Sequence, residues 1–122
     1  MSFILYDPSF KGDESILISC DDLALNWLHR KFELNEEFLV GDGNPIVSRD
    51  DCTLVVRPSL ENLKTQLRRE SDNRFTWLIS DASRIRYWQL IKSMLDSDHP
   101  CHQYLDSDEK ASATVVISKD EY

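Results

Sequence analysis

The chain has 122 residues, of which 41% are hydrophobic and 30% charged, and 22 Asp and Glu against 14 Lys and Arg give a formal net charge of -8. This composition favours one globular domain over residues 1–122 and excludes a disordered chain, because 10% of the residues are aromatic. The acidic excess opposes binding to nucleic acid and to anionic membranes, and no apolar run approaches the roughly 20 residues of a membrane-spanning helix.

The charges are unevenly distributed along the chain. Residues 1–56 carry 11 acidic and 4 basic residues, whereas residues 57–92 carry 4 acidic and 8 basic ones. Residues 93–122 are acidic again, with 7 acidic and 2 basic residues. Acidic segments on a folded surface attract basic partners, so the charge pattern favours a basic protein as the partner.

The first half of the chain predicts two strands, a helix and a hairpin. Short apolar runs favour strands at 3–6 and 15–20. A helix is expected over 21–32, because acidic residues suit its first turn and apolar residues then recur at helical spacing. Segments 36–40 and 46–47 are expected to pair as short strands around the turn between them.

That turn reads Gly41-Asp42-Gly43-Asn44-Pro45 and holds two of the three glycines of the chain. It lacks the Gly-Lys-Ser/Thr of a phosphate-binding loop and the ligand register of an EF-hand. We therefore interpret it as a turn without a ligand of its own.

The second half predicts strands at 52–57 and 74–80 joined by a helix at 59–70. The leucines Leu60, Leu63 and Leu67 have helical spacing, and Lys64, Arg68 and Arg69 would form the basic outer face. A strand, a helix and a second strand in this order form a right-handed parallel crossover.

A third helix is expected with Asp81 or Ser83 as its N-cap and with Ile85, Trp88, Ile91 and Leu95 as its apolar stripe. We expect Trp88 and Leu63 to be core residues. Residues 96–112 are polar and predict a loop containing a short helix, and 113–118 predicts a final strand.

These elements together predict the fold class. Helices and strands alternate in part of the chain, and hairpin-like pairs occupy the rest. The sequence therefore predicts an α+β or α/β domain with a single mixed β-sheet of five to six strands and about three helices packed on it. It does not give the strand order or the oligomeric state.

One cluster has the residue types of a metal or catalytic site. His99, Cys101 and His102 lie close together in the sequence, but adjacent residues point in different directions, and the usual spacing of zinc ligands is missing. We expect no metal, no cofactor and no catalytic residue here. Three cysteines at wide spacing, Cys20, Cys52 and Cys101, favour free thiols in a reducing cytoplasm.

The basic segment 57–92 also contains Phe75 and Trp77. Aromatic side chains on one strand face can stack nucleic-acid bases. They can equally fill the core of a sheet, and the net charge of -8 opposes phosphate binding. We favour core packing and expect no nucleic acid as a partner.

Acidic pairs occur at several places and have three interpretations: solvated loop charge, a docking surface, or catalytic carboxylates. The region 36–51 is the strongest docking candidate, because it holds five acids and one base, Arg49, around the best turn of the chain. The predicted partner-binding residues are Glu36, Glu37, Asp42, Asp50 and Asp51.

The functional prediction is a small acidic cytoplasmic binding module that docks on and blocks a basic, nuclease-like partner. Its charge and size resemble those of bacterial immunity proteins and antitoxins, although no motif ties the chain to a family. The alternative is an adaptor or regulatory subunit of a larger assembly, which would use the basic stripe at Lys64, Arg68 and Arg69 or the apolar helix at 82–96. A small enzyme is the least favoured interpretation.

Overall fold

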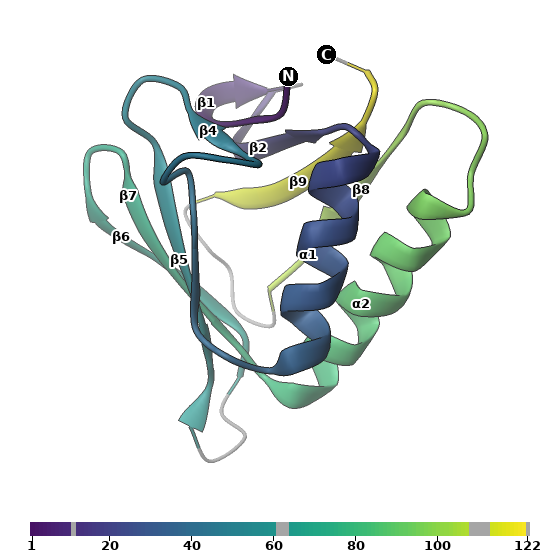
Figure 1. Ribbon diagram of the computed structural model, residues 1–122. Coiled ribbons are helices and arrows are strands. Elements are labelled where there is room, and N and C mark those ends of the chain that lie inside the picture. Colours follow the sequence, from purple (N-terminus) through teal and green to yellow (C-terminus); the bar gives the residue numbers. More distant parts are fainter. Residues whose placement is uncertain (11, 61–63, 108–112, 122) are drawn as a thin grey trace.

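The computed structural model describes residues 1–10, 12–60, 64–107 and 113–121, without the side chain of residue 13. Over these residues the chain is a mixed α+β fold with two β-sheets and two helices. Figure 1 shows the first sheet across the top, the second sheet on the left and the helix pair on the right. The prediction of one sheet and three helices is therefore wrong in part, whereas the α+β class is confirmed.

The first sheet has five strands in the order β4-β1-β2-β9-β8. β2 and β9 run parallel although almost the whole chain separates them, and β1 and β8 flank them in antiparallel pairing. The strands of this sheet are β1 (Phe3–Phe10), β2 (Asp13–Cys20), β4 (Val47–Ser48), β8 (Cys101–Leu105) and β9 (Thr114–Lys119).

The second sheet has four strands in the order β3-β5-β7-β6. β5 and β7 are parallel, as the sequence predicted, and β3 and β6 are antiparallel edges. The strands of this sheet are β3 (Phe38–Val40), β5 (Thr53–Pro58), β6 (Gln66–Ser71) and β7 (Arg74–Ile79).

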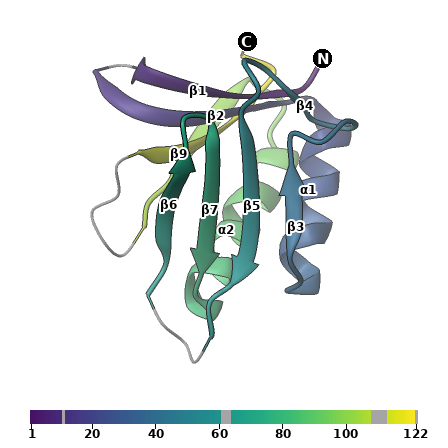
Figure 2. The same cartoon turned by 90° about the vertical axis from the view of Figure 1, so that its left-hand side faces the viewer.

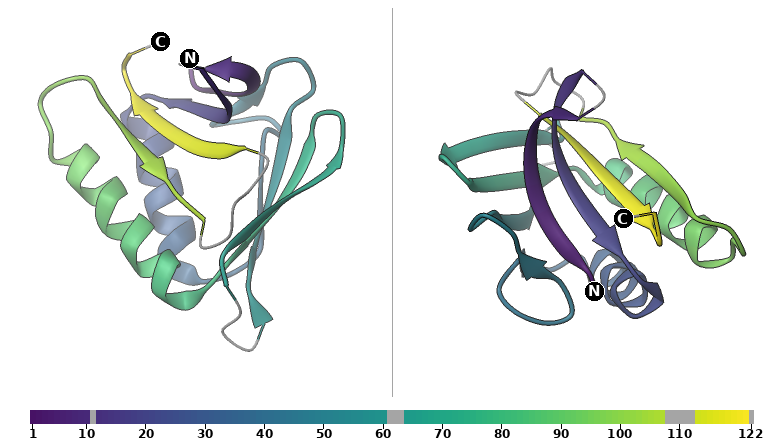
Figure 3. Two further views of the ribbon diagram at one scale, coloured as in Figure 1. Left: turned by 180° about the vertical axis from the view of Figure 1, so that it is seen from behind. Right: turned by 90° about the horizontal axis from the view of Figure 1, so that it is seen from above.

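Helices α1 (Asp22–Leu34) and α2 (Asp81–Leu95) pack against each other and cover the inner faces of both sheets (Figures 1 and 3). Asp21 caps α1 through its side chain, which accepts a hydrogen bond from the backbone N–H of Ala24 at 2.9 Å. The cap of α2 is Ser80 and not Asp81 or Ser83, because its hydroxyl accepts from the N–H of Ser83.

One cluster of buried side chains draws from both sheets and both helices. Phe75 and Trp77 point into it and are 1% exposed, so their expected role in the core is confirmed. The ring of Trp77 stacks on Tyr87 at 5.1 Å. The largest fully buried side chains are Trp77, Tyr87, Phe75, Ile4, Ile16, Ile18, Leu25, Leu28, Ile46, Leu54, Ile91 and Met94.

The predicted helix over 59–70 is wrong for residues 64–70. Gln66–Ser71 forms β6, which pairs antiparallel with β7 and places Leu67 opposite Trp77. The segment is rich in residues that favour a helix, but strand pairing and the burial of one leucine outweigh this local propensity. The connection between the parallel strands therefore contains a strand, and Leu63 lies outside the described residues.

The predicted hairpin around residues 41–45 is also wrong. β3 belongs to the second sheet and β4 to the first, so the chain turns a corner between sheets here. Gly41 makes this corner with a φ of 100°, and an added Cβ atom would lie 2.7 Å from the carbonyl oxygen of Cys52. Only glycine fits that close approach of two backbones.

Two predictions around α2 need correction. Its buried line is Ser83, Tyr87, Ile91 and Met94, while Trp88 is only half-buried. Residues 101–105 form β8 instead of a loop, because all five pair antiparallel with residues 115–119 of β9. A short edge strand that contains polar residues such as His102 and Gln103 gives little signal in the sequence.

Candidate functional site

The segment from Gly41 to Cys52 carries three of the five predicted partner-binding residues. It leaves β3, passes the edge of the first sheet at β4 and returns to β5 through a tight turn. In that turn the N–H of Cys52 donates to the carbonyl oxygen of Arg49 at 3.1 Å. The two central residues, Asp50 and Asp51, have φ values of 53° and 58°.

Positive φ at both central residues is the geometry that Asn-Gly satisfies best and that Asp tolerates at a cost. The turn therefore holds two neighbouring carboxylates on a backbone whose conformation Asn and Gly would adopt at lower cost. Both side chains are exposed.

The second sheet turns its outer face away from the helices. Figure 2 shows this face toward the viewer, with β3, β5, β7 and β6 in front of α2. Leu39, Val55 and Thr76 stand in one cross-strand row on it, because their Cα atoms are register partners across β3, β5 and β7. The row forms a largely apolar strip on this face.

An open hollow of about 640 Å³ lies over this strip, and we call it the sheet hollow. Asp42, Asp51, Glu70 and Arg74 are its charged lining residues. Among the described residues, Asp42, Asp51 and Glu70 make no ion pair or side-chain hydrogen bond. The remaining lining residues are Leu39, Gly41, Ser48, Thr53, Val55, Phe75 and Thr76.

The structure brings together only part of the predicted set. Asp42 and Asp51 line the sheet hollow, and Asp50 adjoins Asp51 in the turn. Glu37 lies at the far end of β3, where it forms an ion pair with Arg57. Glu36 borders a separate narrow slot beneath the end of α1.

Sequence reasoning missed Glu70 and Arg74. β6 and β7 bring them to the sheet hollow, whereas the sequence predicts that Glu70 lies at the end of a helix. The dipeptide Asp72-Asn73 between them could have indicated a hairpin turn.

The cluster at His99, Cys101 and His102 does not converge. His99 is exposed before β8, and neighbouring residues of a strand point to opposite faces, which separates Cys101 from His102. The Nδ1 atom of His102 lies 2.9 Å from Oε1 of Glu121. Among the described residues there is no group of three or more His, Cys, Asp or Glu that could hold a metal ion.

The other two thiols are poor nucleophiles. Burial raises the pKa of Cys20 far above its usual range, and burial raises the pKa of Cys52 to about 11. The reactive form of cysteine is the thiolate, which is scarce at neutral pH in both residues. Catalysis by either thiol is therefore disfavoured.

Comparison with known proteins gives no match: no protein-family model, curated protein sequence or solved structure is similar to this chain. Neither described helix is long and apolar enough to cross a membrane. The site must be interpreted from its own geometry.

Proposed function

We propose that this chain is a small acidic binding module that docks on a basic partner protein through the sheet hollow and the turn at Asp50 and Asp51. We further propose that it blocks that partner in the manner of an immunity protein or antitoxin and acts in the cytoplasm.

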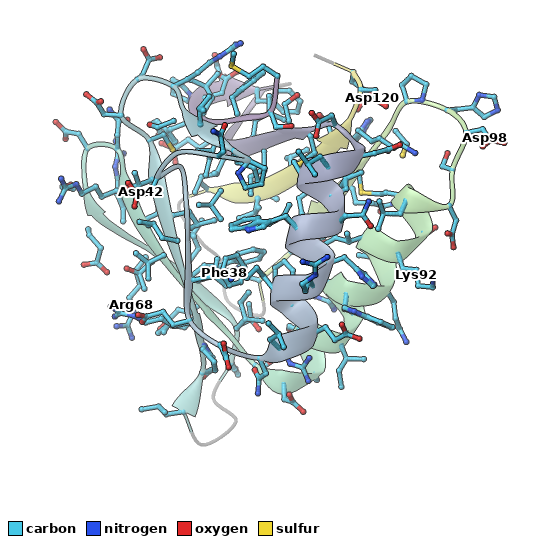
Figure 4. All side chains as sticks on the ribbon, viewed as in Figure 1. Phe38, Asp42, Arg68, Lys92, Asp98 and Asp120 are labelled. Carbon is cyan, nitrogen blue, oxygen red and sulfur yellow. The ribbon has the colours of Figure 1, made fainter. Side chains whose placement is uncertain are left out.

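The observation that supports this proposal most is the set of three carboxylates, Asp42, Asp51 and Glu70, around one hollow with an apolar strip beneath them. Arg74 is the one cation that lines the hollow, so acidic groups outnumber basic ones there. An excess of carboxylates concentrates negative potential and speeds the approach of a cationic surface. The apolar strip adds area that a partner can bury. Figure 4 shows Asp42 on the side of the second sheet, away from the helices.

The adaptor interpretation has less support from the geometry. Arg68 donates from Nε and Nη2 to the Gln66 side chain, and Arg69 donates to backbone oxygens of Ser71 and Asp72. The Arg69 guanidinium also lies 4.7 Å from the ring of Tyr6. Both guanidinium groups thus already interact with groups of this chain, which leaves them less available to a partner. The enzyme interpretation gains no support from the sheet hollow, because this hollow is open to solvent.

The test uses the protein encoded by the neighbouring gene, because an inhibitor of this type is expected beside the gene of its target. Association is measured by stopped-flow fluorescence at several salt concentrations. The double variant Asp42→Asn/Asp51→Asn should associate at least about tenfold more slowly and with a weaker salt dependence, since it removes two steering charges without changing side-chain size.

The matched control is Asp96→Asn/Asp98→Asn, which removes the same charge at the end of α2 and should change the rate much less. The proposal is wrong if both double variants behave alike. If reversal of Arg68 and Arg69 abolishes binding while the aspartate variant binds normally, the adaptor interpretation replaces it.

A further inference from the structure

A second depression lies between α1 and the loop that follows β3, and we call it the helix groove. It has a volume of about 360 Å³, within the range of roughly 300–1,000 Å³ that small ligand sites occupy. Its lining residues are Leu23, Asn26, Trp27, Arg30, Asn44 and Pro45. The loop at residues 41–45 contributes Asp42 to the sheet hollow and Asn44 and Pro45 to this groove.

The groove offers an apolar wall that is open to solvent. Leu23 is 70% exposed in the first turn of α1, one helical turn before the half-buried Trp27. The indole of Trp27 is fixed on its inner side, where it meets the ring of Phe38 edge-on at 5.7 Å. A leucine, a fixed tryptophan and a proline around one depression form the kind of pocket that accepts an apolar anchor side chain.

The charge of the groove is opposite to that of the sheet hollow. Arg30 is its one charged lining residue, and its guanidinium makes no ion pair or hydrogen bond among the described residues. Lys31 follows it and lies over the Trp27 ring at 5.7 Å. A guanidinium binds a carboxylate through two parallel hydrogen bonds.

We propose that the helix groove binds a segment of a partner protein that presents a large apolar side chain next to a carboxylate. The apolar side chain packs on Leu23, Trp27 and Pro45, and the carboxylate pairs with Arg30. This goes beyond the proposed function, because it assigns an acidic, apolar ligand to an otherwise acidic protein. A single partner that covers both depressions would be oriented by two contacts of opposite sign.

The test uses two probes that differ only in the carboxylate, N-acetyl-phenylalanine and its uncharged amide. Each is titrated into the full chain while backbone and indole N–H signals are followed by NMR. We expect N-acetyl-phenylalanine to shift the signals of Asn26, Trp27 and Arg30 with millimolar affinity. The amide should shift the same signals at least about threefold more weakly, since it cannot pair with Arg30.

Variants separate the two halves of the site. Arg30→Gln should reduce affinity for the acid to that for the amide, whereas Lys92→Gln, with the same charge change on α2, should not. Leu23→Ser should weaken both probes, and Leu34→Ser, an exposed leucine at the other end of α1, should weaken neither.

The proposal is overturned if neither probe shifts these signals, if the shifts lie elsewhere, or if Arg30→Gln leaves the preference for the acid unchanged. Because no basic partner is present, the result is independent of the function proposed for the sheet hollow.

Discussion

Asp50 and Asp51 occupy backbone conformations that Asn and Gly adopt more readily than Asp does. Both have positive φ in a turn closed by Cys52 and Arg49, where Asn followed by Gly is the preferred pair. We predict that Asp50→Asn/Asp51→Gly raises the free energy of unfolding by about 0.5–1.5 kcal/mol, because strain at both positions is relieved. Urea denaturation followed by tryptophan fluorescence measures the change.

The same variant should associate more slowly with a basic partner, since it removes two exposed carboxylates. Asn35→Gly is the control, because Asn35 also has a positive φ, of 55°, but lies at the end of α1. It should gain a few tenths of a kcal/mol and leave association unchanged. A variant that is both more stable and equally fast to bind would remove the argument that these aspartates serve binding.

At the scale of elements, Lys119 ties the helix pair to the first sheet. Its side chain is 8% exposed, and its Nζ donates to the carbonyl oxygens of Met94 and Ser97 at the end of α2. The same Nζ lies 3.5 Å from the Asp22 carboxylate in the first turn of α1. One cation thus donates hydrogen bonds at the C-terminal end of α2 and lies near an acidic side chain at the N-terminal end of α1.

We predict that Lys119→Met lowers the free energy of unfolding by about 1–3 kcal/mol, because it keeps the aliphatic stem but removes the donor to the Ser97 carbonyl oxygen. The Met94 carbonyl oxygen loses one donor and keeps the N–H of Ser97. Lys92→Met is the control, because Lys92 is exposed and its ion pair with Asp96 is long, with 4.0 Å between Nζ and Oδ2. It should change stability by no more than about 0.5 kcal/mol. Equal losses in chemical denaturation would show that the contacts of Lys119 add nothing.

Elements with a strong local pattern could be predicted, and those set by distant pairing could not. α1 follows from its cap at Asp21 and its apolar spacing, and β5 from its β-branched residues. β6 contains only one apolar residue, Leu67, and becomes a strand because β7 pairs with it. β8 depends in the same way on β9, so neither strand could be recognised from local sequence.

The same contrast explains how much of the candidate site could be predicted. Asp42, Asp50 and Asp51 lie on one continuous loop, which composition and turn residues indicate. Glu70 joins them only because the two sheets and the hairpin of β6 and β7 place it there. Spacing in the sequence carries no information on such a contact.

At the scale of the whole molecule, the closed core controls the chemistry of two thiols. Cys20 and Cys52 are 2% and 0% exposed, and burial raises the pKa of both, for Cys52 to about 11. In the unfolded chain a thiol has a pKa of about 8.5. Above that pH the unfolded chain releases thiol protons that the folded chain retains. The contribution of the two thiols to folding stability is therefore complete below about pH 8.5 and is lost progressively as the pH rises toward 11.

We predict that the free energy of unfolding falls between pH 9 and 10.5, with each buried thiol contributing up to about 1.4 kcal/mol per pH unit. Urea denaturation across this range measures the slope. Cys52→Ala should be less stable at pH 7, because it leaves a small cavity, but its stability should fall less steeply with pH. Cys101→Ala is the control and should keep the original slope, since Cys101 is only partly buried. Equal slopes for all three proteins would mean that Cys52 ionises as readily in the folded chain as in the unfolded one.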